Sequence, residues 1–370
     1  FFVDRPRPLG YAPPMAPTAL TVDQDRAWFE EDLLERFLRY VRVFTTSDRH
    51  QSGTPSTPGQ FDLAAMLVDE LKRLGVEAPY FDDSCYVIAR IPASAGKEGA
   101  PSIGFMAHVD TAPEDYTVDT ILTTDGTTLL GGDDKAGVAE IMTAVSYMQE
   151  HPEIAHGPIE IIFTPDEEIG RGMDEFPVSK LESTVCYTVD GGDEGTYEAE
   201  CFNAVMASVH FSGRVIHPGS ARGKLANAVT MAGEFLSLLP RSESPEATDG
   251  RFGFYCPVEV SGGMGGARVD LIIRDFEMSE VERRVEAVKR YAAAVEYAYP
   301  GSEVTVEHFE QYRNMRDALR EVPAATELLE EAIRATGMEP VSHAIRGGTD
   351  GARLTQMAVP TPNIFAGPQN

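Results

Sequence analysis

Short apolar segments alternate with helical segments through the first half of this chain, and that alternation limits its fold more than any other feature. Residues 86–91, 102–109, 158–163 and 185–189 are apolar runs of strand length, bounded by Gly, Pro or Asp. Residues 22–41, 61–74 and 135–149 carry apolar side chains at helical spacing. Continuous apolar strands that alternate with helices are typical of a parallel sheet covered by helices. The sequence therefore predicts an α/β fold with a mostly parallel sheet.

The pattern changes after Asn203. Residues 205–211 alternate apolar with small or polar side chains, as a half-exposed antiparallel strand does. A helix over 226–239, a strand over 268–274, a helix over 279–297 and a strand over 303–309 follow. We interpret this block as an inserted α+β domain. The expected boundaries are an N-terminal extension over 1–21, a main domain over 22–204 and 321–370, and the inserted domain over 205–320.

Composition excludes several classes of function. Lys and Arg number 31 against 59 Asp and Glu, a formal charge of −28 that would repel a phosphate backbone, so we expect no nucleic-acid partner. The apolar runs are too short to cross a bilayer, and residues 1–20 do not resemble a signal peptide. The four cysteines form no C-x-x-C pair and are typical of reduced thiols in a cytoplasmic protein.

Acids or a histidine follow the apolar strands or begin a helix at four places. These residues are His108 with Asp110, Asp133 with Asp134, the run 166–168, and Asp190. Each has a structural interpretation when taken alone: a core histidine, a helix cap, a solvated acidic loop and a turn residue.

Together the clusters indicate a metal site. His108, Asp133, Glu168 and Asp190 supply one imidazole and three carboxylates, a mixture that zinc accepts, and one shared carboxylate can bridge two metals. Glu167 would be left over beside a ligand, where a general base is needed. Cobalt and manganese also occupy such sites, so the metal itself stays open.

These motifs, in this order, resemble the peptidase T family of tripeptide aminopeptidases, within the co-catalytic zinc peptidases that include aminoacylases and carboxypeptidases. The resemblance runs from about Leu34 to the end of the sequence. Its main runs are HVDT (108–111), DDKAG (133–137), TPDEE (164–168), YTVDGG (187–192), HPG (217–219), IIRDF (272–276), NMR (314–316) and RGGTDG (346–351).

The resemblance implies a role for each site residue. His108 and Asp190 would bind one zinc, Glu168 the other, and Asp133 would bridge the two. Asp110 would orient His108, and Glu167 would act as the base. The peptide bond after the bridging aspartate is typically cis in this family.

The inserted domain resembles the family's lid, which would contact a short peptide substrate. His217 can donate to an oxyanion, and Arg274 suits capture of a peptide carboxylate. The alternative for Arg274 is a surface ion pair with Asp275 or Glu277. Arg346 and Asn203 are weaker candidates for substrate contact. Relatives occur as dimers, so the resemblance is compatible with a homodimer.

The sequence departs from the family pattern at two points. The second zinc usually takes a last histidine just after the final strand, but the sequence given ends at Asn370 without one, and His343 does not match that position. Because every upstream motif is intact, we expect the chain to continue beyond Asn370. The connection between Asp110 and Asp133 is also shorter than usual, which indicates missing residues around 114–120.

Two other functions fit the same residues. A related zinc dipeptidase, carboxypeptidase or N-acyl amino-acid deacylase would share the metal core and differ in its lid contacts. A non-catalytic peptide-binding scaffold would fit the missing histidine, although the retained Glu167 argues against it.

Overall fold

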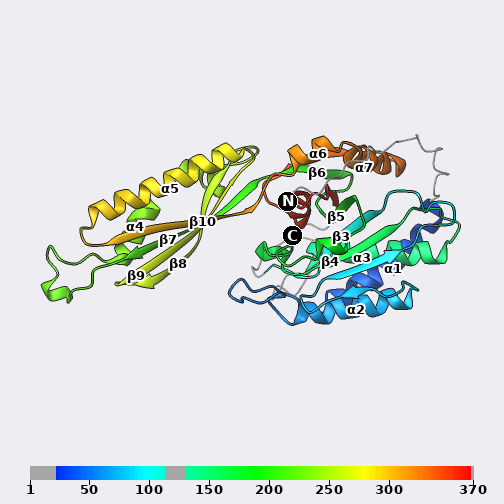
Figure 1. Cartoon of the computed structure of the whole chain (residues 1–370), viewed down its shortest axis with the longest axis horizontal. Coiled ribbons are helices and arrows are strands. Elements are labelled where there is room, and N and C mark those ends of the chain that lie inside the picture. Colours follow the sequence, from blue (N-terminus) through cyan, green and yellow to red (C-terminus); the bar gives the residue numbers. More distant parts are fainter. Residues whose placement is uncertain (1–21, 113–129, 368–370) are drawn as a thin grey trace.

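The computed structural model describes residues 22–112 and 130–367 and arranges them as two sheets with their helices (Figure 1). The larger sheet has the strand order β1-β2-β4-β3-β5-β12-β6-β11. Its strands are β1 (Tyr80–Phe81), β2 (Val87–Ile91), β3 (Ile103–His108), β4 (Ile159–Thr164), β5 (Val185–Gly191), β6 (Thr196–Cys201), β11 (Val341–Ile345) and β12 (Asn363–Phe365). The helices around it are α1 (Val22–Tyr40), α2 (Gly59–Arg73), α3 (Gly132–Glu150), α6 (Arg316–Glu321), α7 (Ala324–Ala335) and α8 (Asp350–Gln356).

The four central strands of this sheet, β4, β3, β5 and β12, run parallel. Every residue of β4 is buried, because helices cover both faces of the sheet. Ile161 packs in the core with α2 and α3, whereas its neighbour Ile162 packs in a separate core with Leu354 of α8. Because the central strands are parallel, their carboxyl ends meet at one edge.

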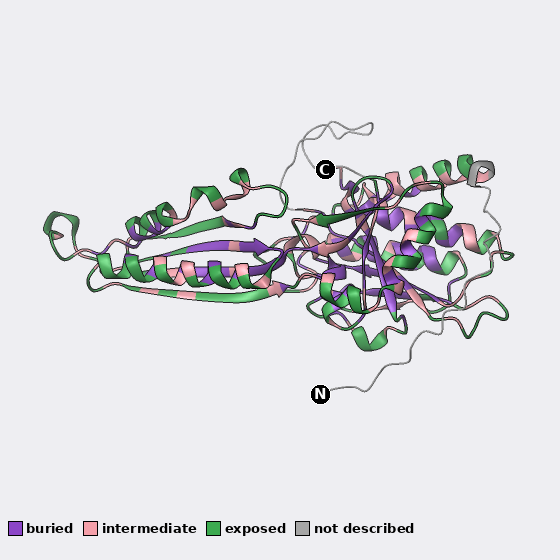
Figure 2. Cartoon of the chain, turned by 90° about the horizontal axis from the view of Figure 1, so that it is seen from above, coloured by how far each residue is buried: buried purple, intermediate pink, exposed green. Residues whose placement is uncertain are grey.

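The second sheet is antiparallel, with the order β10-β7-β9-β8. Its elements are β7 (Asn203–Ser212), α4 (Ala228–Leu238), β8 (Phe254–Gly263), β9 (Gly266–Asp275), α5 (Met278–Ala298) and β10 (Glu303–Tyr312). One face packs on α4 and α5 through a core of its own that includes Val209, Phe235 and Val288. The outer side of α5 is exposed (Figure 2).

The predicted fold class is confirmed: a mostly parallel α/β domain carries an inserted α+β domain, which projects from it as a lid (Figure 1). One part of the prediction was wrong, because the inserted block also contains β8, which sequence reasoning missed. β8 is an edge strand, largely exposed and interrupted by Pro257 with a register shift, so it has no apolar run to reveal it.

The predicted boundaries at residues 204 and 320 remain a proposal; the antiparallel sheet itself begins at Asn203 and ends at Tyr312. The expected extension over 1–21 and the short connection around 114–120 lie outside the described residues. Among the residues that the structure describes, none of the helices combines the length and apolar character that a bilayer crossing requires.

Candidate active site

The predicted site residues gather at the carboxyl edge of the parallel strands. His108 ends β3 and Asp190 lies near the end of β5, while Glu167 and Glu168 follow β4. Asp133 stands in the first turn of α3. Gly137, one turn further along α3, lets this helix approach β5, because a side chain there would overlap the carbonyl oxygen of Val189. The fold thus brings together residues that are up to 82 positions apart in sequence.

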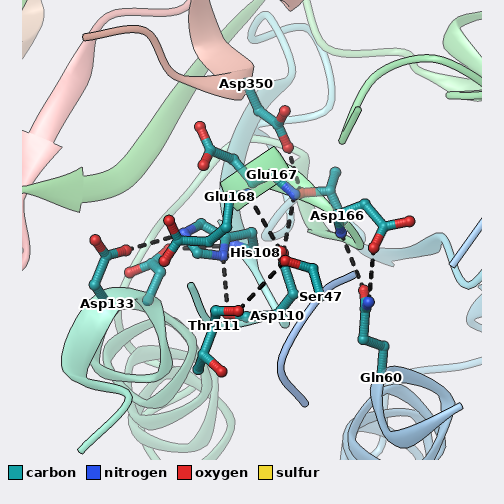
Figure 3. Close-up of polar contacts among 12 residues, drawn as sticks. Ser47, Gln60, His108, Asp110, Thr111, Asp133, Asp166, Glu167, Glu168 and Asp350 are labelled. Carbon is teal, nitrogen blue, oxygen red and sulfur yellow. Dashed lines mark hydrogen bonds and ion pairs between the residues drawn. The ribbon is translucent and has the colours of Figure 1, made fainter. Parts of the chain in front are cut away.

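His108 is the centre of this cluster (Figure 3). Its Nε2 lies 3.0 Å from Oδ1 of Asp133 and 3.7 Å from Oδ1 of Asp190. Ligand atoms of His108, Asp133 and Glu168 lie within 4.8 Å of one another. A second group with the same spacing consists of His108, Asp134 and Asp190. All four residues predicted as metal ligands therefore belong to one cluster.

Asp110 contacts both His108 and the loop that carries Glu167 and Glu168. Its Oδ1 lies 3.2 Å from Nδ1 of His108 on the far side of the ring from Asp133. The same carboxylate accepts the backbone N–H groups of Glu167 at 2.9 Å and Glu168 at 3.2 Å. Asp110 is fully buried, so these hydrogen bonds are shielded from water. It thereby fixes both the imidazole ring and the loop that carries the two glutamates.

Asp134 is a member of the cluster to which sequence reasoning gave no role. Its carboxylate accepts the backbone N–H of His108 and that of Gly137, each at 3.2 Å. These bonds tie the start of α3 to the end of β3 and occupy both oxygens of Asp134. The bond between Asp133 and Asp134 is cis, as the resemblance implied.

Carboxylates outnumber cations in this cluster, and their pKa values show the effect. Burial raises the pKa of Glu168 to about 8 and that of Asp190 to about 7, and nearby carboxylates such as Asp133 add to both. Burial, with Asp190 and other acids, also holds the pKa of Glu167 well above its ordinary range.

Burial and the neighbouring carboxylates act on the pKa of His108 in opposite directions. Burial alone would lower the pKa of its imidazole, but hydrogen bonds to Asp110, Asp133 and Asp190 raise it well above its ordinary value. A carboxylate-rich cluster around one imidazole is relieved when a divalent cation replaces the shared protons. The donor set, with its nitrogen and oxygen ligands, therefore fits zinc or a similar metal.

Two buried aspartates near the cluster were not assigned by sequence reasoning. Asp350, at the start of α8, accepts a hydrogen bond of 2.6 Å from Oγ1 of Thr164, and burial raises its pKa to about 6. Asp166 precedes the two glutamates and contacts Ser56 and Gln60. Both aspartates stand in motifs that the sequence analysis noted, but their partners lie more than a hundred positions away.

The residues predicted to bind substrate occupy different places. Arg274 is buried, donates from Nη2 to Oε1 of Gln311 at 2.9 Å and lies over the ring of Tyr312. It does not form the surface ion pair considered as an alternative, since Asp275 pairs with Arg284 and Glu277 with Arg316. Gln311 in turn lies beside Gly170, two residues after Glu168. Arg274 is thus linked, through Gln311, to the edge of the cluster of predicted metal ligands.

Asn203 and Arg346 lie where the two domains join. Asn203 donates to the backbone carbonyls of Asp275 and Phe276 and accepts the N–H of Asn314. Arg346 donates to the backbone and side chain of Thr248 and to the carbonyl of Phe252. Arg346 therefore joins the large domain to the inserted one, whereas the bonds of Asn203 tie the start of β7 to the end of β9 and to the chain after β10.

His217 lies in the connection between β7 and α4, at the end of the lid farthest from the large sheet (Figure 1). The histidine is exposed, and its Nδ1 accepts the N–H of Gly219 at 3.1 Å. Within this chain the structure does not bring His217 to the cluster around His108, and its role stays a prediction.

Known proteins are similar to this chain in both sequence and fold. Residues 104–370 match the model of peptidase family M20/M25/M40. The chain belongs to this family. Peptidase T from Geobacillus thermodenitrificans is 43% identical to this peptidase, over 92% of both sequences, and peptidase T from Bacillus subtilis is 41% identical over the same shares.

Solved structures confirm the two-domain fold. A tripeptidase from Staphylococcus aureus superposes on this peptidase with a TM-score of 0.74 at 19% identity, covering 91% of this chain and 90% of its own. The aminopeptidase PepT from Bacillus cereus gives a TM-score of 0.70 at 23% identity with the same coverage. The family resemblance inferred from the motifs is therefore confirmed.

Proposed function

We propose that this peptidase removes the N-terminal residue from tripeptides by metal-assisted hydrolysis. The observation that carries this proposal is the convergence of His108 with three carboxylates beside a further carboxylate, Glu167. The similarity to peptidase T over most of both sequences supports an aminopeptidase rather than another hydrolase. A solved structure of the same fold is described as a dinuclear metal-binding peptidase.

Two zinc ions are the metals we propose for the site. His108 and Asp190 would hold one ion, Glu168 the other, and Asp133 would contact both. When bound, two such ions polarise the scissile carbonyl and lower the pKa of an attacking water toward neutrality.

Glu167 is the residue that we propose to move the proton. Its backbone N–H donates to Asp110, so the backbone that carries its carboxylate has a defined place beside the ligands. A carboxylate with a raised pKa can accept a proton from water near neutral pH and later give it to the leaving amine. Glu168, its neighbour, would be occupied as a ligand and could not perform this step.

Arg274 is the side chain that we propose to bind the carboxylate of the peptide. A cation at a fixed distance from the metals would measure peptide length, which is a physical route to tripeptide preference. Closure of the lid would complete the site and exclude water. The four free cysteines support the further proposal that the peptidase acts in the cytoplasm, where thiols stay reduced.

The central test replaces Glu167 with Gln, which keeps the size of the side chain but removes its ability to take a proton. We expect kcat on a tripeptide to fall at least about 10²-fold while the bound zinc, measured by elemental analysis, stays unchanged. Glu182→Gln, an exposed acid on the same domain, is the control and should leave kcat unaltered. An active Glu167→Gln enzyme would contradict the assignment.

A substrate panel separates this function from its alternatives. The panel contains di-, tri- and tetrapeptides with free or acetylated N-termini, and we expect cleavage of tripeptides with a free amine. Activity that survives acetylation would indicate a carboxypeptidase or deacylase instead. Protein that binds no metal and cleaves no peptide would indicate a scaffold.

A further inference from the structure

We propose that Gln60, together with Ser56, is a positioning residue for the proton-transferring Glu167 and acts on it through Asp166. This inference rests on the proposed function of Glu167. It assigns a catalytic consequence to α2, an element that carries none of the predicted site residues. The argument depends on the hydrogen bonds around Asp166, the residue that immediately precedes Glu167.

Gln60 and Asp166 form a reciprocal pair of hydrogen bonds (Figure 3). Nε2 of Gln60 donates to Oδ1 of Asp166 at 2.7 Å, and the backbone N–H of Asp166 donates to Oε1 of Gln60 at 3.0 Å. Both side chains are fully buried. An amide and a carboxylate paired in this way fix the backbone of Asp166 as well as its side chain, without competition from water.

Ser56 completes the set. Its backbone N–H donates to Oδ2 of Asp166 at 2.7 Å, and its hydroxyl donates to Oδ1 at 2.5 Å. Asp166 also has a left-handed backbone, with φ of 56°, a conformation that favours glycine. The four hydrogen bonds from α2 and the preceding loop hold this aspartate in a conformation that sets the direction of the chain into Glu167.

The loop of Glu167 is therefore anchored on both sides. Asp110 accepts the N–H groups of Glu167 and Glu168, and Asp166 is bound to Gln60 and Ser56. Arg171, just after the loop, donates to the carbonyls of Gln51 and Gly53. Residues 51–60 and 166–171 thus form one unit. The side-chain amide of Gln60 donates to Ser56, Thr57 and Asp166 and to none of the proposed metal ligands, so its role is to determine where the carboxylate of Glu167 stands.

Misplacement of a proton-transferring group affects turnover more than binding. A shift of about 1 Å in a catalytic group can reduce the rate by roughly 10²-fold, whereas uniform substrate binding is unaffected. A variant at Gln60 should therefore lower kcat while KM and zinc content stay near their original values. A purely structural role would instead lower the amount of folded enzyme without changing the kcat of the molecules that remain folded.

The experiment uses Gln60→Glu in the full-length protein. The new carboxylate would face the Asp166 carboxylate at hydrogen-bond distance and repel it. We expect kcat on a tripeptide to fall about 10- to 100-fold, KM to change less than about threefold, and amide exchange of residues 166–170 to become faster. Gln149→Glu, an exposed residue on α3, is the matched control and should leave all three unchanged.

A charge swap provides the rescue. In the double variant Gln60→Glu with Asp166→Asn, the side-chain amide moves to position 166 and donates back to the carboxylate at position 60. The Ser56 N–H still has an oxygen to bind, and its hydroxyl can reverse to accept. We expect this double variant to recover most of the kcat that either single variant loses.

Three results would overturn the inference: unchanged kcat in folded Gln60→Glu, no recovery in a folded double variant, or equal losses of kcat and of bound zinc. Failure of the proposed function itself is distinguishable, because Glu167→Gln would then retain activity whatever happens at Gln60.

Discussion

At the scale of single residues, Asp110 shows how one side chain can serve two parts of a site. It contacts the imidazole of His108 and accepts the N–H groups of the two glutamates. The family resemblance implied the first contact, between two residues at the end of one strand. Sequence reasoning did not predict the second, because the glutamates lie more than 50 positions away.

Asp110→Asn is the first prediction at this scale. Oδ1 of Asp110 faces both His108 and the N–H of Glu167, and Oδ2 faces the N–H of Glu168, so the new NH2 group opposes a donor whichever oxygen it replaces. Loss of a partner that orients a metal ligand typically lowers metal affinity 10- to 100-fold, and we expect that loss here. Competition with a chelator measures it. Asp69→Asn, an exposed change on α2, is the control; equal affinities in both variants would refute the orienting role.

Local sequence patterns thus predict the metal ligands, but they do not predict contacts between residues that are far apart in the sequence. His108 and Asp190 lie at the ends of strands, Glu168 follows one and Asp133 begins a helix, so hydrophobic pattern and parallel topology place all four at one edge. Gln60 begins an ordinary amphipathic helix, and its partner Asp166 is 106 positions away. One sequence contains no signal for such a pair.

At the scale of elements, a buried ionic cluster joins α1 to α2. Glu70 on α2 accepts hydrogen bonds from Arg36, from Arg39 at 2.9 Å and from Tyr40 at 3.0 Å, all on α1. Glu70→Ala would leave Arg36, which is buried, without one of its two carboxylate partners. We expect the free energy of unfolding to fall by about 3 kcal/mol, measured by urea denaturation.

Glu35→Ala is the matched control for this cluster. Glu35 lies 4.0 Å from the same Arg39 but is exposed, so its removal should cost less than about 0.5 kcal/mol. Equal effects of the two variants would show that burial does not determine the contribution of Glu70.

Helix α3 carries a carboxyl group whose burial affects stability through pH. Burial raises the pKa of Glu140 from 4.5 to about 8. A raised carboxyl pKa means that stability present below pH 4.5 is lost as pH rises through 8. In Glu140→Gln this loss is absent, so its free energy of unfolding should fall less between pH 5 and pH 9, by up to roughly 4 kcal/mol. Denaturation at both pH values tests this, with the exposed Glu150→Gln as control; parallel pH curves for Glu140→Gln and the parent would contradict it.

At the scale of the whole molecule, the described residues form two domains that meet at a narrow junction (Figure 1), and each domain has a hydrophobic core of its own. Sequence reasoning predicted both domains because the hydrophobic pattern changes from buried to half-exposed strands near Asn203. It missed the edge strands β8 and β11, which are largely exposed, and it also missed the short strand β1 and the mostly buried strand β6. Sequence reasoning also did not predict the junction between the domains, because the polar contacts there join segments that are far apart in the sequence.

Ion pairs at this junction lead to the last prediction. Arg316 of α6 contacts Glu200 of β6 at 3.1 Å and Glu277 of the lid at 2.9 Å, and Arg251 of the lid contacts Glu200 at 2.6 Å. Arg316→Ala leaves Glu277 and Glu200 without the cation between them. Because lid orientation should govern substrate binding more than proton transfer, we expect KM for a tripeptide to rise several-fold with kcat changed less.

Arg320→Ala is the matched change on the same helix. Arg320 is exposed, and its ion pair with Asp317 is long, at 3.7 Å. The kinetics of this variant should equal those of the parent. Salt should act on the parent in the same direction as the Arg316 variant does, because screening weakens the pair of Arg316 with Glu277, whose side chain is exposed. The KM of the parent should therefore approach that of Arg316→Ala as ionic strength rises, whereas the variant's KM should respond less. A KM that rises with salt to the same extent in both proteins would show that other charges control the lid.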